Sequence, residues 1–125
     1  MKASELKNTG KIIELLDGNH KITIDFNAYG GLEEIYGDMQ TAFSKFTGKV
    51  NSKDVKNFIS VGINACIEDE NEHFTPFQVG KLLDIRKTQI YVDLLLKLLN
   101  ESMPAPKKDE DEDVESVTSV EDGKN

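Results

Sequence analysis

The sequence predicts an α+β fold that is mostly helical, with an N-terminal β-hairpin packed on four to five short helices and a disordered acidic C-terminal tail. Two β-prone runs lie within residues 11–26, and in the second, residues 21–26, apolar and polar residues alternate, as in a strand with one buried face. From residue 27 onward, the apolar spacing changes to that of amphipathic helices. After Met103, prolines and acidic residues replace the apolar pattern, and such a composition is typical of disorder.

The hairpin is predicted from two β-prone runs, residues 11–16 and 21–26, which flank the turn-forming residues 17–20. The residues expected on its buried face are Ile22, Ile24 and Phe26. Because a lone hairpin is only marginally stable in water, we expect this face to lie against helices.

Two short helices should follow the hairpin. Asn27 is the expected N-cap of the first, which runs to about Tyr36 and stops at Gly37. The inward residues expected in it are Leu32, Ile35 and Tyr36. The second covers residues 38–46, with one apolar side formed by Met39, Ala42, Phe43 and Phe46. Gly30-Gly31 lacks the fingerprint of a dinucleotide fold, so we expect it to pack the helix start tightly against the hairpin.

Ser52 begins a clearer helix, because Asp54 follows in the acid-favouring first turn. Its apolar stripe is expected at Val55, Phe58, Ile59, Gly62 and Cys66. Thr75-Pro76 predicts the start of the next helix, with Gln78 placed to complete a capping box. That helix carries Phe77, Val79, Leu82 and Leu83.

The last helix, about residues 86–100, is apolar over most of its circumference. At about 100° per residue, its polar side chains fall within one arc of roughly 80°, and the other positions are apolar. One side must pack on the domain, whereas Val92, Leu96 and Leu99 are either buried in the core centre or covered by a partner. Val61 and Ala65 would extend the same surface. These five residues are the candidate partner-binding site, for a second copy or for a foreign apolar segment.

A chain of 125 residues fits one domain. We expect a flexible N-terminus over residues 1–9, a compact domain over residues 10–102 and the disordered tail over residues 103–125. No segment approaches the roughly 20 apolar residues of a membrane span, and a single cysteine, Cys66, allows no internal disulfide. These features predict a cytoplasmic protein that does not engage a membrane.

The net charge of -8 is unevenly distributed. Residues 1–103 carry -3 and residues 104–125 carry -5. The nearly balanced body lacks the basic footprint that binds phosphate backbones, so we expect no nucleic-acid partner.

No motif nominates a catalytic, cofactor or metal site, and we expect a protein that is not an enzyme. None of the Gly-Lys pairs is followed by Ser or Thr, as a phosphate loop requires. A nucleophilic pair of Cys66 and His73 is conceivable, but Cys66 is expected to be a small core residue. Asp69, Asn71 and His73 alternate like the start of a calcium loop, yet Phe74 occupies the position of its glycine.

Three stretches of the chain carry a family resemblance. In residues 24–37, the short strand is followed by the leucine-glutamate pair Leu32-Glu33 and by Gly37. Residues 52–65 are expected to form a helix that opens with a Ser/Asp turn. In residues 74–84, a helix that begins at a threonine carries Val79-Gly80 ahead of a small leucine cluster. In this order they resemble the tail assembly chaperones of long-tailed (siphovirus-type) bacteriophages, over about residues 10–100.

The resemblance implies a function in virion morphogenesis in the cytoplasm of the bacterial host. Members of that family bind the tape-measure protein, keep it soluble and help to deliver tail-tube protein around it. A tape-measure protein is itself largely helical and apolar, which suits binding of a helix in a groove. The alternative from a different class is a small acidic regulatory or inhibitor protein that acts by protein-protein contact.

Overall fold

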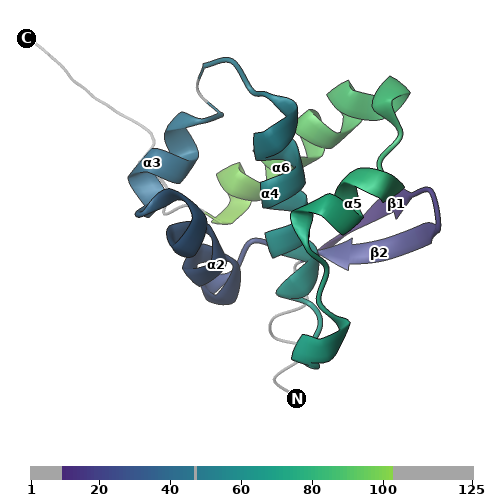
Figure 1. The fold of residues 1–125 in the computed structure, drawn as a ribbon. Helices are drawn as coiled ribbons and strands as arrows, with labels where there is room; N and C mark the ends of the chain where they lie inside the picture. Colours follow the sequence, from purple (N-terminus) through teal and green to yellow (C-terminus); the bar gives the residue numbers. More distant parts are fainter. Residues whose placement is uncertain (1–9, 47, 103–125) are drawn as a thin grey trace, which may run out of the picture.

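The computed structural model describes residues 10–46 and 48–102. Within this part of the chain, a two-stranded antiparallel hairpin is followed by five α-helices and two short 3₁₀ helices (Figure 1). The predicted fold class is confirmed. The expected flexible N-terminus and the expected disordered acidic tail lie outside the described residues.

The hairpin turns earlier and more tightly than predicted. Strand β1 (Lys11–Leu15) pairs with β2 (Gly18–Ile22), so β2 begins inside the predicted turn. Gly18 adopts a φ of 128°, which favours glycine, and the Leu16 N–H at the tip donates to the Leu82 carbonyl at 2.8 Å. The pairing with β1 ends at Ile22 because the next amide, that of Thr23, donates to Gly62 O of helix α4 (Ser52–Asn64) at 3.1 Å.

Helix α2 (Phe26–Tyr36) begins before the predicted Asn27 cap. The Asp25 carboxylate accepts a hydrogen bond from Ala28 N at 3.0 Å, so Asp25 is the N-cap and the helix starts where the strand was expected to continue. As a result, Phe26 lies on the first turn and is 86 % exposed, and Ile35 is also exposed. The expectation that both residues face the core is therefore wrong, whereas the stop at Gly37, with a φ of 96°, is confirmed.

Most of the remaining helices begin at side-chain caps. Thr75 and Gln78 form the predicted capping box at the start of α5 (Pro76–Leu82). Asn51 accepts from Asp54 N and caps α4, which begins at Ser52 as predicted. The elements are α3 (Met39–Ser44), the 3₁₀ helix η1 (Glu70–Glu72), α5 (Pro76–Leu82), the 3₁₀ helix η2 (Ile85–Lys87) and α6 (Thr88–Ser102).

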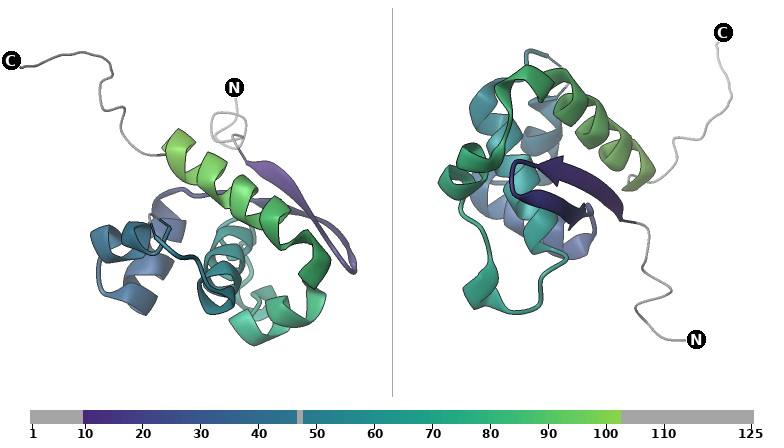
Figure 2. Two further views of the ribbon diagram at one scale, coloured as in Figure 1. Left: turned by 90° about the horizontal axis from the view of Figure 1, so that it is seen from above. Right: turned by 90° about the vertical axis from the view of Figure 1, so that its right-hand side faces the viewer.

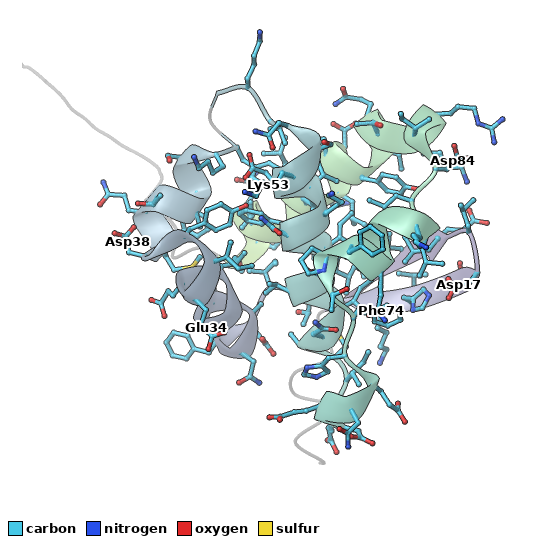
Figure 3. All side chains as sticks on the ribbon, viewed as in Figure 1. Asp17, Glu34, Asp38, Lys53, Phe74 and Asp84 are labelled. Carbon is cyan, nitrogen blue, oxygen red and sulfur yellow. The ribbon has the colours of Figure 1, made fainter. Side chains whose placement is uncertain are left out.

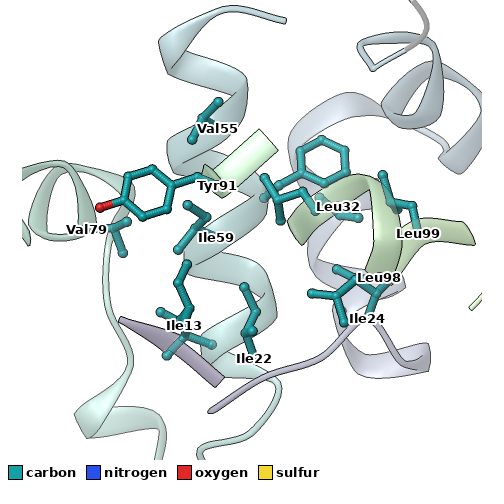
Figure 4. Close-up of a cluster of buried hydrophobic side chains, with 14 of the residues drawn as sticks. Ile13, Ile22, Ile24, Leu32, Val55, Ile59, Val79, Tyr91, Leu98 and Leu99 are labelled. Atoms are coloured by element: carbon teal, nitrogen blue, oxygen red, sulfur yellow. The ribbon is translucent and has the colours of Figure 1, made fainter. Parts of the chain in front are cut away.

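Helix α4 is the centre of the core and contacts α2, β2, α5 and α6. Helix α6 lies across the side of α4 that faces away from the viewer of Figure 1, next to the hairpin (Figure 2). Side chains from the hairpin, α2, α4, α5 and α6 meet in one cluster, part of which is shown in Figure 4. Its buried members on α6 are Tyr91, Leu95, Leu98 and Leu99.

None of the helices in residues 10–46 and 48–102 combines the length and apolar character needed to cross a bilayer.

Candidate partner-binding groove

An open groove of about 540 Å³ lies between α2, the C-terminal half of α4 and the segment from η1 to the start of α5. Figure 3 shows Glu34 on α2 and Phe74 ahead of α5 on either side of the lower part of α4. The apolar side chains that line the groove are Phe26, Ile35, Val61, Ala65, Phe74 and Pro76. Such a surface suits an apolar partner segment.

One wall is held by a pair of hydrogen bonds across ten residues of sequence. The side-chain amide of Asn64, at the end of α4, donates to Phe74 O at 2.9 Å and accepts from Phe74 N at 2.8 Å. The His73 ring donates from Nε2 to Ile67 O at 2.7 Å, because a carbonyl can only accept. These bonds fix residues 73–74 against the end of α4.

The opposite wall is α2, which can approach α4 closely because it has a glycine, Gly31, where the two helices meet. A Cβ at Gly31 would lie 3.0 Å from Val61 Cγ1, so Gly31 packs α2 against α4 and not against the hairpin as expected. A Cβ at the neighbouring Gly30 would meet nothing within 4 Å. Gly30 therefore leaves open space in the groove.

The charged residues that line the groove are acidic. Glu34 comes from α2 and Glu70 from η1, and within residues 10–46 and 48–102 no lysine or arginine belongs to the lining. A groove of this kind can hold an apolar surface between two carboxylates.

The structure divides the five predicted partner residues between two regions. Val61 and Ala65 line the groove. Val92 and Leu96 lie on α6, half-buried against the core, and Leu99 is only 4 % exposed. For Leu99 the structure therefore favours the first of the two alternatives, burial in the core, and placing Leu99 on an accessible partner surface is wrong.

The sequence pattern does not predict the groove residues contributed by α2 and by the segment before α5. Phe26 and Ile35 were expected in the core, and Gly30 was expected to pack against the hairpin. The exposure of Phe26 follows from the Asp25 cap, which sets where α2 begins. The sequence Asp25-Phe26-Asn27 allows this earlier helix start, because aspartate is as good an N-cap as asparagine.

The expected position of Cys66 on a buried stripe is also wrong. Helix α4 ends at Asn64, and Cys66 lies exposed in the following turn, with its sulfur 3.8 Å from Gly62 O. Partial desolvation of the sulfur, reinforced by the Asp25 carboxylate, raises the pKa of the Cys66 thiol, which disfavours the nucleophilic thiolate. Among the described residues, no hydrogen bond joins Cys66 to His73.

In the described part of the chain, no group of three or more His, Cys, Asp or Glu side chains is placed to hold a metal ion. Comparison with protein-family models, with curated proteins and with solved structures finds no match for the chain.

Proposed function

We propose that this chain is a tail assembly chaperone of long-tailed bacteriophages, which binds the tape-measure protein and helps to recruit tail-tube subunits. It acts by non-covalent binding of an apolar partner segment and not as an enzyme. The observation that carries the proposal is where the three stretches with the family resemblance lie in the fold. Residues 24–37, 52–65 and 74–84 are far apart in the sequence, yet each contributes to the lining of the same groove.

The chemistry of the groove supports the proposed partner. Its apolar residues project from two helices and one fixed loop, and Phe26 is almost fully accessible. A helical, apolar protein such as a tape measure aggregates unless its apolar surface is covered, and a groove between helices is a common way to cover it. The partner segment would bury Phe26 and Ile35, which the isolated chain leaves in water.

The proposal is tested by co-expressing the chain with fragments of the tape-measure protein from the same genome. We expect a soluble complex, with the fragment insoluble when it is expressed alone. Phe26→Ser and Gly30→Trp should each weaken binding about tenfold or more, because the first removes an anchor and the second fills open space in the groove.

Ile85→Ser is the matched control, because Ile85 is 87 % exposed and lies outside the groove. It should bind like the wild type. A tape-measure fragment that neither binds nor becomes soluble would overturn the proposal, and capture of a basic DNA-binding protein instead would favour the acidic inhibitor.

A further inference from the structure

We infer that the groove selects an amphipathic helix whose apolar stripe is flanked by lysine or arginine side chains. This inference deepens the proposed function and rests on it, because it states which segments of the partner the chaperone would bind. Three features of the groove carry the argument: the hydrogen bonding of its walls, the space at Gly30 and the sign of its charges.

The walls favour a helix over an extended peptide. An added strand needs a row of unpaired backbone groups on the receiving side. Here α2 and α4 use their backbone groups within the helices, and the N–H and C=O of Phe74 are both bonded to Asn64. An extended occupant would leave its own N–H and C=O groups without partners on these walls, whereas a helix satisfies them internally.

The space above Gly30 sets how the helix is seated. A Cβ at Gly30 would meet nothing within 4 Å, while Val61 and Ala65 provide apolar surface from α4 and Phe26 and Phe74 provide aromatic surface. A bulky apolar side chain of the occupant can enter the space beside Gly30. Its neighbours one turn away along the same stripe then contact the aromatic rings.

The acidic residues of the groove determine which charged side chains are favoured beside the apolar stripe of the bound helix. Glu34 and Glu70 come from different elements, and none of the lysine or arginine residues in the described part of the chain lines the groove. The remaining basic candidate, His73, already donates its Nε2 proton to Ile67 O. Carboxylates on the occupant would be repelled, whereas lysine or arginine can lay an apolar stem along the groove and bring its charge to these glutamates.

The test uses two synthetic helical probes of about 18 residues, or five turns. Both carry the same stripe of leucine and alanine, flanked in one probe by lysines and in the other by glutamates. Fluorescence anisotropy gives Kd for each. Exposed charge pairs of ordinary strength predict that the wild type prefers the lysine probe by about tenfold at low salt. The preference should shrink in about 0.5 M salt.

The double variant Glu34→Lys with Glu70→Lys should reverse this preference. The matched control is Glu14→Lys with Glu101→Lys, which changes the net charge equally at two exposed carboxylates outside the groove. The control separates local selection from general attraction of a basic peptide to an acidic protein. It should retain most of the preference for lysine.

Equal affinity for the two probes, or equal effects of the two double variants, would overturn the inference. The proposed function would survive that result if tape-measure fragments still bind through Phe26 and Gly30. Conversely, if the lysine preference reverses as expected but no tape-measure fragment binds, the selectivity of the groove stands and the proposed function fails.

Discussion

The side-chain amide of Asn64 makes two hydrogen bonds to the backbone of Phe74: it accepts from Phe74 N at 2.8 Å and donates to Phe74 O at 2.9 Å. A single side chain thus satisfies the complete backbone hydrogen bonding of a residue ten positions later. The pair closes the loop that contains η1 and delivers Phe74 to the groove.

The Asn64 amide should therefore stabilise the fold as well as the groove wall. Asn64→Ala removes both hydrogen bonds and leaves the half-buried Phe74 backbone groups to find water, so we expect a loss of roughly 1–3 kcal/mol in the free energy of unfolding. Urea denaturation followed by circular dichroism measures it. Asn100→Ala, at an exposed position of α6, is the control and should change the value by less than about 0.5 kcal/mol. Equal midpoints for the two variants would show that the pair contributes nothing.

Two glycine-to-alanine changes should have opposite effects on stability. A Cβ at Gly62 would lie 2.7 Å from Ile22 Cγ1 and 3.2 Å from Thr23 O, where the hairpin meets α4. Gly62→Ala should cost roughly 1–3 kcal/mol through overpacking, although alanine favours the helix by up to about 1 kcal/mol.

Gly30→Ala meets no neighbouring atom and should stabilise α2 by about 0.5–1 kcal/mol through helix propensity alone. Thermal melts of the Gly62→Ala and Gly30→Ala variants test these two predictions, with the melting temperature expected to fall for the first and to rise for the second. A stabilising Gly62→Ala would mean that the hairpin moves away from α4 without cost.

The leucines of α6 should behave as core residues. Leu99 is buried, so Leu99→Ala removes packed methyl groups and should lower the free energy of unfolding by roughly 2–5 kcal/mol. Ile90→Ala on the same helix is the comparison, because Ile90 is 61 % exposed, and it should cost less than about 1 kcal/mol. Chemical denaturation of both variants decides the matter. If both variants lose less than about 1 kcal/mol in the free energy of unfolding, Leu99 is not a core residue and a partner surface remains open to it.

The sequence is most informative where one residue type has one local role. The Thr75-Gln78 capping box, the stop at Gly37 and the apolar side of α3 all follow from local chemistry, and each is present. Local patterns cannot show which of two apolar faces a neighbour covers. Leu99 and Ile35 illustrate this, since both lie on helical apolar positions, yet only the first is buried.

Only the part of the groove that lies on α4 is predicted from the sequence, because local patterns do not show which faces of neighbouring helices meet. Val61 and Ala65 lie off the main stripe of α4, and the structure places both, half-buried, in the lining of the groove. Their grouping with α6 was wrong because helical spacing gives directions around one axis and says nothing about how α4 is oriented relative to α2 and α6. The close approach of Gly31 to Val61 shows only where α2 meets α4.

A partly buried polar cluster joins α2 to α4. The Tyr36 hydroxyl donates to Asp54 Oδ1 at 2.7 Å and accepts from Asn57 Nδ2 at 3.2 Å. Asp54 is only 4 % exposed, so its carboxylate depends on such donors. Burial, together with the hydrogen bond to Asp54 and the charge of that carboxylate, raises the pKa of the Tyr36 phenol well above its ordinary value, while the Asn57 amide acts in the opposite direction.

This cluster predicts that the Tyr36 contribution to stability declines in alkaline solution. The unfolded chain loses the phenol proton near pH 10.0, whereas the folded chain retains it. Between those two pKa values the unfolded state binds fewer protons, so the free energy of unfolding falls as pH rises, by at most about 1.4 kcal/mol per pH unit for one group. Below the unfolded pKa the contribution is fully present.

Tyr36→Phe isolates the effect, because it removes the phenol and keeps the ring. At about pH 7 it should cost roughly 1–3 kcal/mol, since Asp54 loses a charge-assisted hydrogen bond. Above about pH 10 the wild type should lose stability faster than the variant, so the gap between them narrows. Urea denaturation of both proteins from about pH 7 to about pH 11 measures the gap, and lysine titration cancels because both proteins share it. A gap that stays constant across this range would show that the folded chain does not hold the Tyr36 proton more tightly than the unfolded chain does.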